Sequence, residues 1–80
     1  MISKGDLIRL TRVHLDLTQL ELAKLIGSKR LETISAYERG VKKVTYQRLC
    51  QIYVVYCKLG TPCQQLDNIF NDYIEKMFKE

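Results

Sequence analysis

The chain has 80 residues, of which 46% are hydrophobic and 28% are charged, and its formal net charge is +4. This composition is typical of one small globular domain and excludes a disordered chain. No apolar run approaches the ~20 residues that a transmembrane helix needs. Lys4, Asp6 and Arg9 interrupt the N-terminus, where a signal peptide would be apolar. We therefore expect a single cytoplasmic domain over residues 1–80, with no membrane association.

The positive charge is concentrated in residues 1–48, which contain ten Lys or Arg and five Asp or Glu. Residues 49–80 contain three basic and four acidic residues. Within the first part, residues 28–48 contain six basic and two acidic residues. Such clustering raises the local electrostatic potential and favours phosphate binding through counterion release. The segment is a candidate surface for a polyanion; the alternative is a solvated basic surface without such a partner.

The first helix is predicted over residues 4–15. Ser3 is followed three residues later by Asp6, as in a capping box, and apolar residues follow at helical spacing. The single histidine, His14, lies near the end of this helix, and no cluster of ligands or catalytic partners surrounds it in the sequence. We expect a surface or helix-end role for His14.

Two short helices joined by a turn follow. Thr18 and Glu21 form a capping box that begins a helix over residues 19–26. A further helix is predicted over residues 31–39, and Gly40 ends it. Two such helices in sequence indicate a helix-turn-helix.

The helix over residues 31–39 has two different faces. Ile34 and Tyr37, three residues apart, form its inward stripe. The outer and flanking positions carry short side chains edged by charge, namely Glu32, Thr33, Ser35, Ala36 and Arg39. Small residues allow close approach in a major groove about 12 Å wide, and hydroxyls can read base edges there. The pattern therefore predicts a DNA recognition helix.

A fourth helix is predicted from Tyr46 to Leu59, between Thr45 and Gly60. By propensity alone, residues 52–57 resemble a strand because they are rich in β-branched and aromatic residues. We favour a helix because the segment has helix punctuation at both ends and apolar residues at helical steps.

Residues 62–79 are predicted to form a long amphipathic helix with Pro62 at its first helical position. Its apolar stripe comprises Leu66, Ile69, Phe70, Tyr73, Ile74, Met77 and Phe78. The spacing within this stripe resembles a heptad seam. We expect the stripe to cover part of the core and to form a homodimer interface. The alternatives are a fifth core helix in a monomer and a contact with a different protein.

The three cysteines, Cys50, Cys57 and Cys63, are an odd number without secretory context, which favours reduced thiols. We expect them to act as small buried hydrophobic residues, with redox or metal sensing as the alternative. The sequence contains no metal-ligand spacing, no nucleophile–base arrangement and no phosphate-cradling glycine loop. It therefore predicts no metal site, no cofactor and no enzymatic activity.

Several short motifs recur in one known family. They are Leu17-Thr18-Gln19, Leu22-Ala23, Gly27, Ile34-Ser35 and Glu38-Arg39-Gly40. With these motifs, residues 4–60 resemble the xenobiotic-response-element (XRE) family, the phage-repressor type of helix-turn-helix protein. The resemblance implies an all-α fold of the phage-repressor type, and the helix over residues 62–79 brings the number of predicted helices to five. It also implies a structural ion pair between the first helix and the recognition helix, for which Arg12 and Glu38 occupy the matching positions.

The resemblance further implies residues that contact the DNA backbone. Gln19, at the N-terminus of the second helix, is expected to meet a phosphate and to buttress the recognition helix. Further phosphate contacts are expected from Arg39, Lys42, Lys43 and the amides capped by Thr45. Such contacts position a protein on DNA without selecting a sequence.

The base-reading residues depend on where the recognition helix starts, because six residues separate Gly27 from Ile34 where the family usually has five. If Ile34 is the anchor, Leu31, Glu32, Ser35 and Ala36 occupy the reading positions. An earlier start capped by Ser28 would add two residues of the turn. The candidate base-reading set is therefore Lys29, Arg30, Leu31, Glu32, Thr33, Ser35 and Ala36.

Two members of this set suggest particular base contacts. The guanidinium fork of Arg30 matches the O6 and N7 acceptors of a guanine. Glu32 has two interpretations: it accepts a hydrogen bond from a cytosine amine, or it interacts with the positive end of the helix dipole.

These features predict a sequence-specific regulator of transcription that binds double-stranded DNA, acting as a repressor on a palindromic operator as a homodimer. The alternative is an antitoxin-like or adaptor protein. In that case the C-terminal helix would bind a different protein, and DNA binding would serve autoregulation.

Overall fold

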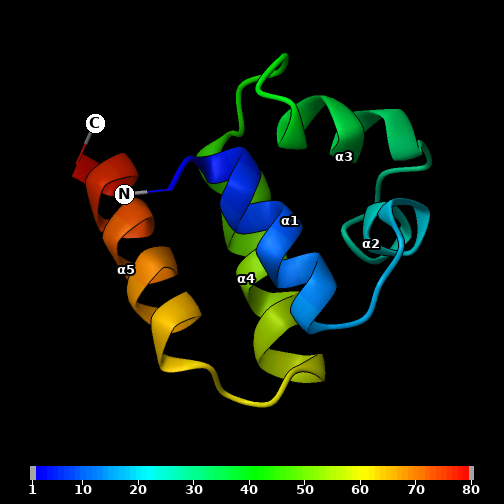
Figure 1. Cartoon of the computed structure of the whole chain (residues 1–80). Coiled ribbons are helices and arrows are strands. Elements are labelled where there is room, and N and C mark those ends of the chain that lie inside the picture. Colours follow the sequence, from blue (N-terminus) through cyan, green and yellow to red (C-terminus); the bar gives the residue numbers. More distant parts are fainter. Residues whose placement is uncertain (1, 80) are drawn as a thin grey trace.

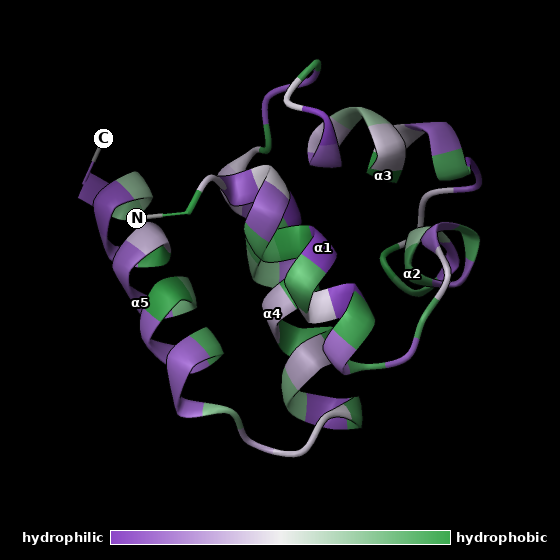
Figure 2. Cartoon of the chain, viewed as in Figure 1, coloured by the Kyte–Doolittle hydropathy of each residue, from purple (hydrophilic) through white to green (hydrophobic). Residues whose placement is uncertain are grey.

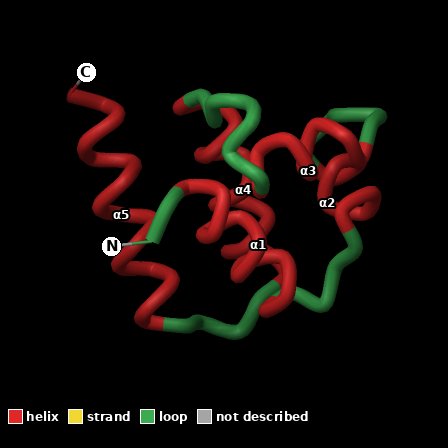
Figure 3. Tube along the Cα trace, turned by 45° about the horizontal axis from the view of Figure 1, so that its top comes forward, coloured by secondary structure: helices red, strands yellow, loops and turns green. Residues whose placement is uncertain are grey.

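The structure is a computed structural model that describes residues 2–79, and these residues form five helices and no strand (Figures 1 and 3). The helices are α1 (Lys4–His14), α2 (Gln19–Leu25), α3 (Leu31–Glu38), α4 (Tyr46–Leu59) and α5 (Gln64–Lys79). The predicted all-α fold is confirmed, and the strand-like residues 52–57 lie inside α4. The prediction that Pro62 occupies the first helical position of α5 is wrong, because this helix begins at Gln64.

Three of the helices begin with the same local hydrogen bond. A hydroxyl accepts from the backbone amide three residues later, at 3.1 Å for Ser3, 3.1 Å for Thr18 and 3.2 Å for Thr45. At α2 the capping box is complete, because the Thr18 amide also donates to Glu21 at 2.8 Å. This backbone hydrogen bond lowers the pKa of the Glu21 carboxyl below its ordinary value. Local sequence thus determines where these helices start.

The helices pack in two groups around one core. In Figure 1, α2 and α3 lie on one side of α1, and α5 lies on the other side, next to α1 and α4. The buried apolar side chains come from all five helices, from the residue that follows α2 and from one loop residue. They are Leu7, Ile8, Leu22, Ala23, Ile26, Ile34, Tyr37, Val44, Leu49, Ile52, Val55, Tyr56, Leu66 and Phe70. Thr11 is also fully buried, and its hydroxyl donates to the Leu7 carbonyl at 2.8 Å, so its polar atom is satisfied within the helix.

The start of α1 packs closely against the end of α3 at Gly5, which is buried. A Cβ atom at this position would clash with the carbonyl oxygen of Tyr37 and would lie 2.9 Å from that of Glu38. Glycine therefore permits an approach between these helices that a side chain would prevent.

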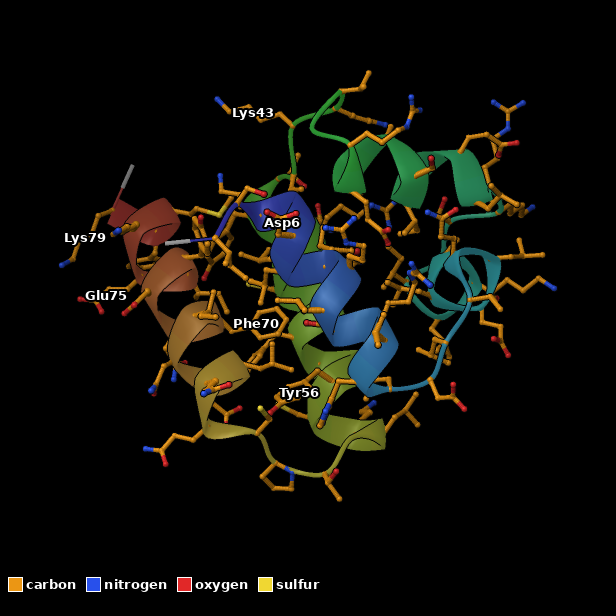
Figure 4. The ribbon with its side chains drawn as sticks, viewed as in Figure 1. Asp6, Lys43, Tyr56, Phe70, Glu75 and Lys79 are labelled. Carbon is orange, nitrogen blue, oxygen red and sulfur yellow. The ribbon has the colours of Figure 1, made fainter. Side chains whose placement is uncertain are left out.

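Helix α5 directs most of its apolar stripe into the chain's own core. Figure 2 shows its hydrophobic side facing α1 and its hydrophilic side facing outward, and Figure 4 shows Phe70 between α5 and the other helices. Leu66 and Phe70 are buried, whereas Phe78 is 76% exposed. The partly buried members of the stripe pack against the same core, and they are Ile69, Tyr73, Ile74 and Met77. Through these side chains α5 covers part of the core.

Two tyrosine hydroxyls attach α5 and its preceding loop to the rest of the chain. The Tyr56 hydroxyl donates to the Cys63 carbonyl at 3.1 Å and accepts from the Cys63 amide at 2.8 Å. Burial raises the pKa of Tyr56. The Tyr73 hydroxyl donates to the carbonyl of Ile2. The Tyr56 bonds hold the loop before α5 against α4, and the Tyr73 bond holds the N-terminal segment against α5.

The cysteines are less buried than expected. Cys50 and Cys63 are partly buried, and Cys57 is exposed. Cys57 lies five residues after the buried Ile52, so helical periodicity places it on the outer side of α4. The expectation of three buried cysteines is therefore wrong for Cys57. His14 is exposed, as expected, and its Nε2 lies 2.8 Å from the Thr61 carbonyl.

Candidate DNA interface

The recognition helix α3 begins at Leu31, with Arg30 as its N-cap residue in an extended conformation. Ser28 does not cap this helix, since its hydroxyl accepts from the Arg30 amide at 3.4 Å within the turn. The earlier start capped by Ser28 is therefore wrong, and α3 begins at Leu31, as in the alternative that takes Ile34 as the anchor. Lys29 and Arg30 remain exposed immediately before the helix.

The two faces of α3 differ as the sequence predicts. Ile34 is 0% exposed and Tyr37 is 3% exposed, so these two side chains hold the inner face against the core. Positions two residues before and after Ile34 lie on the opposite side of a helix with 3.6 residues per turn, and these positions are Glu32 and Ala36. The side of α3 that faces away from the core thus carries the carboxylate of Glu32 and the methyl group of Ala36.

A buried carboxylate fixes the C-terminal end of α3. Glu38 accepts from Arg12 Nε at 2.8 Å and Nη2 at 3.3 Å, and from Gln19 Nε2 at 3.3 Å. Its side chain is only 6% exposed. Arg12 also donates to the Leu17 carbonyl at 3.1 Å. The ion pair that the resemblance implies is present, and it connects α1, α2 and α3 through one group of hydrogen bonds.

Gln19 therefore has a structural function within the chain, because its amide supports Glu38. Since Gln19 is the first residue of α2, it also lies at the positive end of that helix. The buttressing role implied by the resemblance is visible in this hydrogen bond. The phosphate contact remains a prediction.

The cations expected to contact phosphate lie around the end of α3. Arg39 donates from Nε to the Ser35 hydroxyl at 3.2 Å, so these two residues of the expected interface are linked. Lys42 Nζ lies 5.8 Å from the centre of the Tyr37 ring, in a cation–π contact. Lys43 is exposed in the loop between α3 and α4, where Figure 4 shows it pointing away from the domain. Thr45 is exposed at the start of α4.

One basic residue of the segment has a structural role instead. Arg48 Nη1 donates to the Ile26 carbonyl at 2.6 Å and to Gln51 Oε1 at 3.1 Å. It thereby satisfies a carbonyl at the C-terminal end of α2 and connects this helix to α4. The charge count alone assigned Arg48 to the polyanion surface, and no local sequence pattern indicated this long-range hydrogen bond.

The comparisons with known proteins agree with this arrangement. The helix-turn-helix family matches residues 8–52, which is more than half of the chain. The chain therefore belongs to the XRE family of helix-turn-helix DNA-binding proteins. No curated protein and no solved structure matches it.

Membership of this family assigns the chain a DNA-binding role in the regulation of transcription. Proteins of this family are generally not enzymes. Among residues 2–79, every helix is too short or too polar to cross a membrane.

Proposed function

We propose that this protein is a sequence-specific transcriptional repressor that inserts α3 into the major groove of double-stranded DNA. The observation that carries the proposal is the difference between the faces of α3. Its inner face is fixed by Ile34, Tyr37 and the buried Glu38, while its outer face is open to solvent and bordered by cations. A rigidly held helix with a free polar face is suited to reading base edges.

The contacts divide into two classes. The turn and the outer side of α3 supply the base-reading residues, which we propose to be Lys29, Arg30, Leu31, Glu32, Thr33, Ser35 and Ala36. The surrounding cations and helix N-termini supply the phosphate contacts, for which we propose Gln19, Arg39, Lys42, Lys43 and Thr45. Phosphate contacts set affinity and its salt dependence, whereas base contacts set specificity.

We further propose that the repressor acts as a homodimer on a palindromic site. A two-fold dimer would present two copies of α3 about 34 Å apart, one to each half-site. The α5 stripe offers less surface to a second copy than its sequence suggested, because Leu66 and Phe70 are buried within one chain. Phe78 remains the exposed apolar residue of that stripe. Sedimentation of the wild-type protein tests this proposal, and a monomer at micromolar concentrations would end it.

DNA binding is tested by a mobility-shift assay with duplex DNA from upstream of the protein's own gene, at about 0.15 M salt. Specific repression predicts a complex that survives excess unrelated duplex. The alternative function is an adaptor that binds a different protein. A stable hetero-complex together with no sequence preference on DNA would contradict the repressor and support the adaptor.

Alanine variants test the division of contacts. We expect Arg39→Ala and Lys43→Ala to weaken binding to all sequences and to reduce its salt dependence. Arg30→Ala should relax selection at one base pair, with a loss of about 1–3 kcal/mol on the best site. Ser35→Ala should affect one base pair and also free Arg39 from its intrahelical bond. Equal losses on specific and unrelated DNA for all four variants would refute the division.

A further inference from the structure

Glu32 occupies the middle of the surface that α3 offers to DNA. It is exposed, it is the second residue of the helix, and it lies opposite the buried Ile34. The only other acidic residue within residues 28–48 is Glu38, whose carboxylate is buried in its network with Arg12 and Gln19. Glu32 is therefore the one carboxylate of the basic segment that can face a ligand.

This carboxylate has no hydrogen-bond or ion-pair partner among the described residues, although Lys29, Arg30 and Arg39 are near it in sequence. Arg39 bonds to Ser35 instead. Neutralisation of a neighbouring cation is thus not the role of Glu32 in this structure. The helix dipole favours an acidic residue in the first turn of α3, but this interaction is the same with and without DNA.

A carboxylate on a DNA-facing surface is repelled by phosphate groups, so it needs a compensating contact with a base. An ionised carboxylate only accepts hydrogen bonds. In the major groove, guanine presents two acceptors, thymine presents an acceptor and a methyl group, and adenine presents a donor next to an acceptor. Cytosine presents its N4 amine, a donor without an adjacent acceptor of its own. Cytosine is therefore the base that suits an unpaired carboxylate.

The neighbouring residue on the same face allows this contact. Ala36 lies one helical turn after Glu32, and its side chain is a single methyl group. A large side chain at this position would hold the helix away from the base edges. The small residue instead lets α3 come close enough for the carboxylate to reach a base.

We propose that Glu32 accepts a hydrogen bond from the N4 amine of a cytosine and so selects a C·G pair in each half-site. This inference rests on the proposed function of α3 as a DNA recognition helix. It makes Glu32 a specificity-determining residue, as opposed to a residue that only stabilises the helix end.

The first test is the selection of binding sites from a random duplex library by the wild type, Glu32→Ala and Glu75→Ala. Alanine removes every acceptor of the side chain, whereas glutamine would keep an amide oxygen. Glu75→Ala is a matched control, because Glu75 is exposed on α5, far from α3, and pairs with Lys79 at 3.1 Å (Figure 4). We expect the wild type and Glu75→Ala to select the same cytosine, and Glu32→Ala to lose it at one position of each half-site and to retain the other preferred bases.

The second test removes only the amine. The selected cytosine is replaced by 2-pyrimidinone, which lacks the N4 amino group, and binding to both duplexes is measured for the three proteins. We expect the substitution to weaken wild type and Glu75→Ala by at least about fivefold, the low end for a good base contact. Glu32→Ala should bind the two duplexes within about twofold of each other, because its side chain has no acceptor for the amine.

The outcomes separate this inference from the proposed function. If Glu32→Ala selects the same bases as the wild type, or if loss of the amine weakens all three proteins equally, Glu32 does not read cytosine, although α3 still reads DNA. If the wild type selects no sequence at all, the repressor proposal and the inference both fail.

Discussion

The recognition helix α3 has eight residues and the C-terminal helix α5 has sixteen, and the two are attached to the chain by different interactions. Helix α5 is held by apolar burial. The centre of the Phe70 ring lies 5.0 Å from the centre of the Tyr53 ring and 5.6 Å from that of the Tyr56 ring. Helix α3 has two buried apolar residues, and a buried carboxylate and a glycine contact fix its end. Apolar burial stabilises the domain as a whole, whereas the polar contacts of α3 determine where one helix lies.

The largest expected effect concerns α5. Phe70→Ala removes a fully buried ring and leaves a cavity, so we expect a loss of about 3–5 kcal/mol in the free energy of unfolding. Urea denaturation followed by circular dichroism measures it. Leu59→Ala is the control, because Leu59 is 58% exposed and lies outside the α5 stripe, so its loss should cost under about 0.5 kcal/mol. Similar losses for the two variants would mean that α5 does not pack as described.

The second effect concerns the polar contacts of α3. Glu38→Gln leaves the guanidinium of Arg12 without its counter-charge at a site where the two side chains are 19% and 6% exposed. We expect a loss of about 3 kcal/mol, the low end for a broken buried pair, by the same denaturation measurement. The exposed pair of Glu75 and Lys79 provides the control, and Glu75→Gln should cost at most about 1 kcal/mol. Equal costs would show that burial does not distinguish these pairs.

The third effect has an unusual sign. Gly→Ala within a helix normally stabilises it by up to about 1 kcal/mol. Gly5→Ala should instead destabilise the domain by about 1–3 kcal/mol, because the added methyl group would meet the carbonyl oxygens of Tyr37 and Glu38. Thermal denaturation gives the sign directly. An increase in melting temperature would contradict the close contact between α1 and α3.

The features of the helices that depend on local sequence could be predicted before the structure was known. The hydroxyls of Ser3, Thr18 and Thr45 each accept a hydrogen bond from the amide three residues later, so the starts of these helices could be predicted from the sequence. The pairing of Arg12 with Glu38 followed from the family resemblance. These features depend on local chemistry or on a known motif, and the structure contains them.

Other features depend on contacts between residues far apart in the chain. The sequence does not reveal that Gly5 lies against α3 or that Arg48 bonds to the end of α2, because neither residue forms a local motif. The apolar stripe of α5 could be recognised in the sequence, but the surface against which it packs could not. Buried and intermolecular stripes have the same periodicity, so only the packing of α5 on α1 and α4 distinguishes them.

The smallest effect is a pH dependence at α2. The pKa of Glu21 is lowered by its hydrogen bond from Thr18, so the folded state binds this proton less readily than the unfolded state. Its contribution to stability is therefore present above the ordinary pKa of a glutamate and is lost as the pH falls through the lowered value. We expect Glu21→Gln to show a shallower loss of stability in acid than the wild type. Identical pH profiles of the two proteins would contradict this assignment.

The measurement that tests the central claim most directly is the change in backbone amide NMR signals when the wild-type protein binds its selected duplex. We predict the largest changes over residues 29–45 and at Gln19, with small changes on the outer face of α5 at Gln65, Asn68 and Asp72. Large changes on that face of α5, with α3 unaffected, would contradict the assignment of α3 as the helix that reads DNA.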